Sequence, residues 1–122
     1  MEKKINDIIQ FFIDNSIILD SQIEEICAFK EEYRNFVRII FKTLAEGNYK
    51  DKKMAVTFID VNKMDFFDDE GAVVGMYVSS YKLINENDGN VYLSIDPDES
   101  TRDKSKKDGG VVICKDIDYR CL

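Results

Sequence analysis

A chain of 122 residues with 44% hydrophobic residues and a net charge of −7 has the size and composition of one folded domain. Its apolar runs are far shorter than the roughly 20 residues that a membrane-spanning helix needs. Its charge disfavours nucleic acid and anionic membranes as partners, because both are negative. The first residues are charged and lead into an amphipathic stretch, without the apolar block of a signal peptide, so we expect a cytoplasmic protein.

Two helices are expected in the first part of the chain. Over about residues 2–14, isoleucine and phenylalanine recur at helical spacing. A second helix is expected over about residues 22–46. Ser21 and Glu24 have the spacing of a capping box at its start, and Gly47 is the residue type that commonly ends a helix.

From residue 53 the apolar pattern changes to a period of two, which indicates strands. The expected strands cover about residues 54–61, 72–86, 91–96 and 111–119. Residues 97–110 are polar and rich in Asp, Ser and Lys, and we expect a mobile loop there. The sequence therefore predicts an α+β domain in which two N-terminal helices pack on one face of a four- or five-stranded antiparallel sheet.

The pair Asp88-Gly89 fits a two-residue hairpin loop, where positive φ is needed. This loop would place Ile84 opposite Leu93 and Asn85 opposite Tyr92. One apolar face of the sheet would then pack on the helices. Its members would be Val74, Met76, Val78, Ile84, Val91, Leu93 and Ile95.

No catalytic, cofactor-binding or metal site is predicted. The chain has no histidine, the most frequent general base and a common metal ligand. Its two closely spaced glycines, Gly71 and Gly75, fall within a strand pattern, which is the wrong context for a phosphate-binding loop. The three cysteines, Cys27, Cys114 and Cys121, are odd in number and not spaced as a zinc site, so we expect reduced thiols.

The loop between the first two strands is the first candidate binding surface. It sets two adjacent aromatic rings among four carboxylates, which a basic protein surface would accept. Its residues are Asp65, Phe66, Phe67, Asp68, Asp69 and Glu70. The alternative is that one ring tucks under the sheet edge and the carboxylates are simply solvated.

The sheet face opposite the expected core is the second candidate. Alternation places Tyr77, Tyr81 and Tyr92 on it, together with Asp116 and Asp118 of the last strand. Tyrosine is enriched at interfaces, because it buries a large area and keeps a hydrogen-bonding tip. The alternative is the ordinary wet face of an antiparallel sheet.

As a whole, the chain resembles the bacterial immunity proteins that neutralise a cognate toxin in contact-dependent growth inhibition. The resemblance lies in a short acidic domain with an acid-rich middle: residues 51–100 hold 11 acidic and 4 basic residues. It implies one basic protein partner, a toxin domain, which is often a nuclease. Two alternatives stay open: a secretion or assembly chaperone, and a small-molecule-binding cone domain. The second would need convergent polar residues on the core face, where the pattern offers only Lys82 and Glu86.

Overall fold

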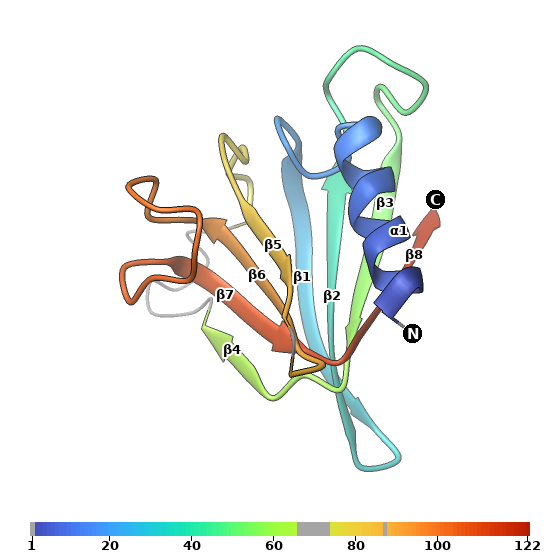
Figure 1. The fold of residues 1–122 in the computed structure, drawn as a ribbon. Helices are drawn as coiled ribbons and strands as arrows, with labels where there is room; N and C mark the ends of the chain where they lie inside the picture. Colours follow the sequence, from blue (N-terminus) through green and yellow to red (C-terminus); the bar gives the residue numbers. More distant parts are fainter. Residues whose placement is uncertain (1, 66–73, 87) are drawn as a thin grey trace.

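The computed structural model describes residues 2–65, 74–86 and 88–122. Within these residues the chain forms one helix, α1 (Glu2–Asp14), and eight strands in two antiparallel sheets, with orders β1-β2-β3-β8 and β4-β7-β6-β5 (Figure 1). The strands are β1 (Gln22–Glu31), β2 (Arg34–Lys42), β3 (Lys53–Ile59), β4 (Lys63–Asp65), β5 (Lys82–Asn85), β6 (Val91–Asp96), β7 (Gly109–Cys114) and β8 (Asp116–Cys121).

The expected α+β fold with two helices on one sheet is wrong, because residues 22–46 form the β1–β2 hairpin instead of a helix. Val37, Ile39 and Phe41 point into the core, while the alternate residues of β2 lie half-buried on the outer face and include Phe36 and Ile40. Apolar residues on both faces hide the period of two, and the run then looks helical. The Val, Ile and Phe content of the segment suits a strand.

The expected capping box does not form either. The Ser21 hydroxyl donates to the backbone carbonyl of Ile18 at 2.6 Å. The Glu24 carboxylate lies 3.6 Å from the ammonium of Lys53 on β3. Ser21 therefore stabilises the turn before β1, and Glu24 forms an ion pair within the sheet.

Other segments coincide with or depart from the expected strands. Helix α1, β3 and β6 lie where residues 2–14, 54–61 and 91–96 were expected to form regular elements. Within the described part of residues 72–86, only β5 is a strand, and Tyr77 makes a single bridge to Gln22. The expected strand over residues 111–119 is divided between β7 and β8, which belong to different sheets.

The β5–β6 hairpin is one residue out of the expected register. Leu83 lies opposite Leu93, and Ile84 lies opposite Tyr92. A backbone hydrogen bond of 2.8 Å from Glu86 to Asn90 closes the turn. The shift moves Ile84 from the expected core face to the outer face, because a slip by one residue exchanges the two faces of a strand.

Two stretches of chain join the sheets at a corner. β3 leads into β4 and β7 leads into β8, and the two stretches stay paired across the bend through backbone bonds from Lys115 to Ile59 and from Asn62 to Ile113, both 2.9 Å. Asp60 takes a positive φ of 57° at this bend. From the corner the sheets diverge, and α1 packs against β8 of one sheet and β5 of the other (Figure 1).

The core fills the space between the two sheets and α1. Phe12, Phe41 and Phe58 are fully buried there. Phe11 of α1 stacks on Tyr119 of β8 with ring centroids 4.9 Å apart. The outer face of β1-β2-β3-β8 carries no covering element among the described residues, whereas residues 97–108 fold over the outer face of β5-β6-β7 (Figure 1).

Candidate partner-binding surface

Of the two surfaces expected from the sequence, the structure describes one residue of the first and all residues of the second. Phe66, Phe67, Asp68, Asp69 and Glu70 lie outside the described residues. Asp65 ends β4, half-buried.

The expected tyrosine and aspartate face is not formed. Tyr77 is 62% exposed, Tyr92 is buried, and Tyr81 is half-buried against the core, where burial raises its pKa. Asp116 and Asp118 lie on β8, in the other sheet from Tyr92 on β6. These residues do not share a face for two reasons: the chain changes sheet at Lys115, and residues 97–108 cover Tyr92.

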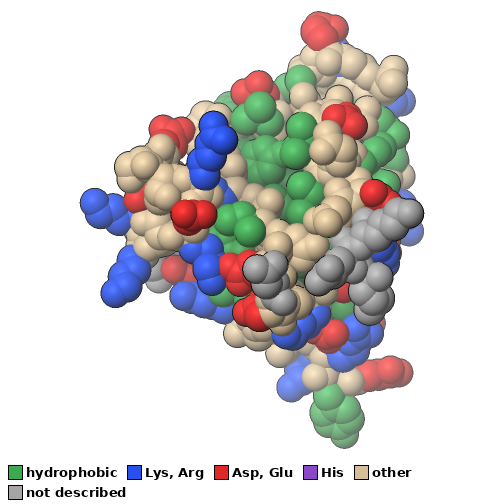
Figure 2. Space-filling view, viewed as in Figure 1, with side chains coloured by type: hydrophobic (Ala, Val, Ile, Leu, Met, Phe, Trp, Pro, Cys, Tyr) green, Lys and Arg blue, Asp and Glu red, His purple; other side chains and the backbone are tan. Residues whose placement is uncertain are grey.

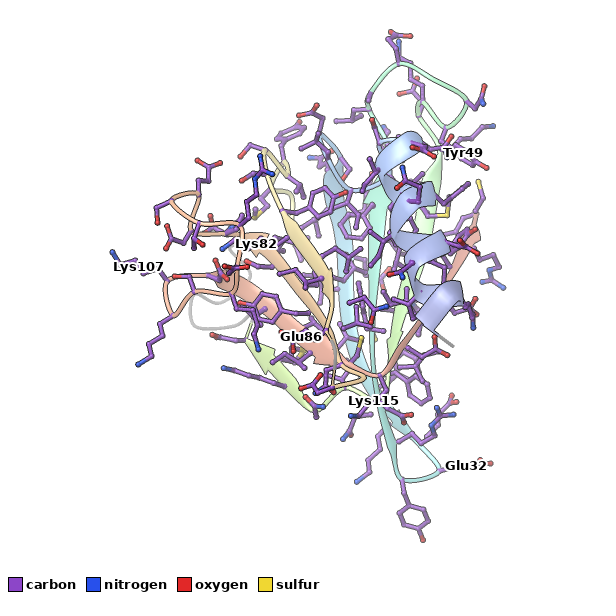
Figure 3. The ribbon with its side chains drawn as sticks, viewed as in Figure 1. Glu32, Tyr49, Lys82, Glu86, Lys107 and Lys115 are labelled. Carbon is purple, nitrogen blue, oxygen red and sulfur yellow. The ribbon has the colours of Figure 1, made fainter. Side chains whose placement is uncertain are left out.

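A buried carboxylate organises residues 97–108. Asp108 Oδ1 accepts hydrogen bonds from Lys82 Nζ at 2.8 Å and from the backbone N–H of Asp98 at 2.8 Å. Its Oδ2 accepts from the Tyr92 hydroxyl at 2.6 Å and the Ser105 backbone N–H at 2.9 Å. Figure 3 shows Lys82 reaching from β5 towards this loop.

The electrostatics of Asp108 match this geometry. Burial opposes its ionisation, but the donated hydrogen bonds, led by that of Lys82, outweigh burial and hold the pKa of Asp108 below its usual range. In turn, burial and the bond to Asp108 raise the pKa of Tyr92. Both Asp108 oxygens are already occupied by two donors each, so we interpret the group as a structural centre, and not as a general base.

A second carboxylate holds the outer part of the same loop. Asp98 accepts from the Ser100 hydroxyl at 2.7 Å and from the Ser105 hydroxyl at 2.7 Å. These bonds, with one from the Ser100 backbone, lower the pKa of Asp98 to about 2. The loop is thus tied by hydrogen bonds along its length, and its expected mobility stays a prediction.

Lysine side chains surround an open hollow beside this centre. The hollow has a volume of about 320 Å³ and lies next to Tyr92 and Asp108, with Lys63, Lys104 and Lys106 among its lining residues. Figure 2 shows Lys and Arg side chains gathered on this side of the molecule. Lys104 is paired with Glu86 at 2.7 Å. Among the described residues, no three Asp, Glu or Cys side chains are placed to hold a metal ion.

The tip of the β1–β2 hairpin is the most unusual exposed feature. Glu32 and Tyr33 form the turn with φ of 48° and 68°. Two positive φ values are the pattern of a type I′ turn, which normally takes Asn, Asp or Gly. Tyr33 is 96% exposed. Figure 3 shows Glu32 at the far end of a hairpin that extends away from the body of the molecule.

Aromatic and charged side chains line the outer face of the hairpin behind this tip. Phe29 and Phe36 stack with centroids 5.0 Å apart. The Arg34 guanidinium lies over Phe36 at 5.6 Å and forms a two-pronged pair with Asp60, at 2.7 and 2.8 Å. Arg38 lies over Phe29 at 6.0 Å. These contacts join the two arms of the hairpin behind its exposed tip and connect β2 to Asp60.

We define the hairpin surface as Phe29, Glu31, Glu32, Tyr33, Arg34 and Phe36. At its foot lies a hollow of about 230 Å³, lined by apolar residues that include Ala28, Val37 and Met64 and by the polar residues Asn35, Asn62 and Lys63. Sequence reasoning missed this surface because residues 22–46 were interpreted as a helix. The available signal was the run of β-branched and aromatic residues on either side of a short polar break, which is typical of a hairpin.

We compared the chain with protein-family models, curated proteins and solved structures. The chain matches no family model, no curated protein and no solved structure. In the described part of the chain, no helix is long and apolar enough to cross a bilayer.

Proposed function

We propose that this chain is a protein-binding inhibitor of the immunity type, which neutralises a toxin by covering a basic surface. The observation that carries the proposal is the hairpin tip, where an almost fully exposed tyrosine directly follows two acidic residues in a strained turn. Glu31 and Glu32 are exposed beside Tyr33, and the whole chain has a net charge of −7. Acidic surface steers a basic partner towards the tip, and tyrosine supplies contact area once the partner is bound.

The backbone of the tip supports a binding role. A non-glycine residue held at positive φ costs on the order of 1–2 kcal/mol, and such positions cluster at functional sites. Tyr33 gains almost no burial in return within the free protein. In the proposed complex, the ring is buried by the partner and the strained turn directs it outwards.

The proposal includes action in a reducing compartment such as the cytoplasm. All three cysteines are unpaired, and Cys114 is buried in the core, where burial raises the pKa of its thiol to about 12. A thiol in that state is not reactive, and unpaired cysteines are typical of reducing compartments.

The test combines capture of a partner with variants of the tip. The tagged chain is used to capture a protein from its source cells, and the affinity for the purified partner is measured by calorimetry at two salt concentrations. We expect a basic partner whose activity is inhibited and whose affinity falls with salt. Tyr33→Ala should weaken binding by about 2 kcal/mol, or roughly thirtyfold, and Glu32→Lys should weaken it and reduce its salt dependence.

Two variants serve as matched controls. Tyr77→Ala removes the other exposed tyrosine, and Glu46→Lys reverses a charge on the exposed loop before β3. Both should bind like the original chain. A captured partner that is acidic, or one that is bound equally well by the Tyr33→Ala variant, would contradict both the binding role of the hairpin tip and the proposed function.

A further inference from the structure

The outer edge of β1 is only partly paired in the described structure. β1 is the terminal strand of its sheet. Along its first residues it is covered by residues 75–78: Ile23 N–H donates to Met76 at 2.9 Å, and Gly75 N–H donates to Ile23 at 2.7 Å. Gln22 and Tyr77 form an antiparallel bridge. This edge therefore accepts an antiparallel strand at one end.

The remainder of that edge, residues 25–31, has no second strand beside it among the described residues. A terminal strand presents alternate N–H and C=O groups sideways, and these groups are a template for one more strand. The only irregularity is a bulge between Ile23 and Glu25, which lies before the open part. The edge carries no proline, which would block such pairing.

Charge and shape along this open edge select the kind of strand that fits. Glu25 lies near one end and Glu31 with Glu32 lies at the other, and Lys30 is the one basic residue among residues 25–31. On the β2 side, Glu25 lies 3.5 Å from Arg38 and Glu31 lies opposite Arg34. Lysine or arginine in the added strand would meet these carboxylates across the strands. Between the charged ends, Ala28 lines the hollow of about 230 Å³ together with Val37 and Met64, so the residue opposite Ala28 can place an apolar side chain against this part of its lining.

We propose that residues 25–31 bind an extended basic segment of the partner as an added antiparallel strand. The inference deepens the proposed function and rests on it for the identity of the partner. The backbone groups supply the affinity, the hollow takes one apolar side chain, and the carboxylates at the two ends select for positive charge. The hairpin tip and the open edge of β1 belong to the same strand, so one partner can contact both.

The register of β1 defines a probe peptide, Lys-Thr-Val-Leu-Val-Thr-Lys, with both ends blocked. Added antiparallel, its terminal lysines lie opposite Glu31 and Glu25, and its leucine lies opposite Ala28. One control peptide is N-methylated at alternate residues, which removes backbone donors without changing charge. The other has glutamate in place of both lysines. Amide exchange of residues 25–31 is followed by NMR in the free chain and with saturating peptide.

We expect every second amide of residues 25–31 to exchange quickly in the free chain and about tenfold more slowly with the probe peptide. Both control peptides should leave the exchange unchanged. Glu25→Lys with Glu31→Lys should weaken the probe peptide about tenfold, and Glu46→Lys should not. Slow exchange in the free chain would mean that the edge is already paired and would overturn the inference, as would no binding, or binding without protection.

The two proposals fail in different ways. If no basic partner is captured but the probe peptide still protects alternate amides of β1, the immunity function is wrong and the strand-binding edge stands. If the partner binds through Tyr33 while the β1 amides exchange as in the free chain, the function stands and the added strand is wrong.

Discussion

At the scale of single residues, Asp108 is the group on which the local structure most depends. Its carboxylate joins β5 through Lys82, β6 through Tyr92, and the backbone of the covering loop. The Lys82 and Asp108 side chains are almost completely buried. A buried charge that loses its partner is strongly destabilising, even where the intact pair adds little net stability.

Removing either partner of this pair should therefore reveal their coupling. We expect Asp108→Asn and Lys82→Met each to lower the free energy of unfolding by about 3–5 kcal/mol. The double variant should lose clearly less than the sum of the two, because neither charge is left buried alone. Urea unfolding of the four proteins completes the cycle. Additive losses would show that the pair is not coupled.

At the scale of elements, the β1–β2 hairpin balances stability against function. Its turn holds Glu32 and Tyr33 at positive φ, which these residue types adopt reluctantly. Asn-Gly is the pair that a type I′ turn prefers. The natural pair keeps an acidic and an aromatic side chain at the most exposed point of the molecule, as the proposed function requires.

Replacing this turn should separate the two properties. Glu32→Asn combined with Tyr33→Gly should raise the free energy of unfolding by about 1–2 kcal/mol, because the strain of the turn is relieved. The same variant should lose the affinity for the partner that Tyr33→Ala loses. Thermal unfolding and calorimetry measure the two effects. A turn variant that is less stable than the natural chain would show that Tyr33 stabilises the fold.

The sequence patterns predicted some elements of this fold correctly and others wrongly, and the reasons can be identified. The apolar stripe of α1 is clear because its apolar residues recur at helical spacing. The alternation in β6 is clear because its aliphatic residues all lie on one face, although Tyr92 and Ser94 on the other face are buried as well. β2 places Phe36 and Ile40 on its outer face, so alternation is lost and a helix was expected. The candidate surface followed this error, since Tyr33 cannot be seen as a hairpin tip until the hairpin is known.

Long-range pairing was also beyond the local pattern. The break at Lys115 carries no proline or glycine signal, yet it divides the expected last strand between two sheets. The polar composition of residues 97–110 predicted a loop but not its attachment to Lys82 and Tyr92, because hydrogen bonds between distant residues leave no periodic trace. Lys82 was expected on the core face, and its burial under this loop depends on the observed register.

At the scale of the whole molecule, stability should depend on acid. Asp98 and Asp108 both have pKa values below the usual value near 4. A carboxyl group whose pKa is lower in the folded state stabilises the fold above its unfolded pKa. That contribution is lost as the pH falls towards the folded pKa, which is about 2 for Asp98.

We therefore expect the free energy of unfolding to be constant from neutral pH to about pH 5 and to decrease between about pH 4 and pH 2. Asp98→Asn should be less stable at neutral pH and should show a shallower decrease, since its amide does not titrate. Urea unfolding across this pH range tests both statements. A decrease that begins above pH 6 would point to a different titrating group.

The corner where β3 passes into β4 and β7 passes into β8 has a consequence for denaturation. Each of these stretches supplies a strand to both layers, so neither layer can melt while the other keeps its full hydrogen bonding. Heating should give one calorimetric transition, with equal calorimetric and van't Hoff enthalpies. We expect that two fragments cut at Asp60 do not fold on their own, and that mixing them restores structure only through their reassociation.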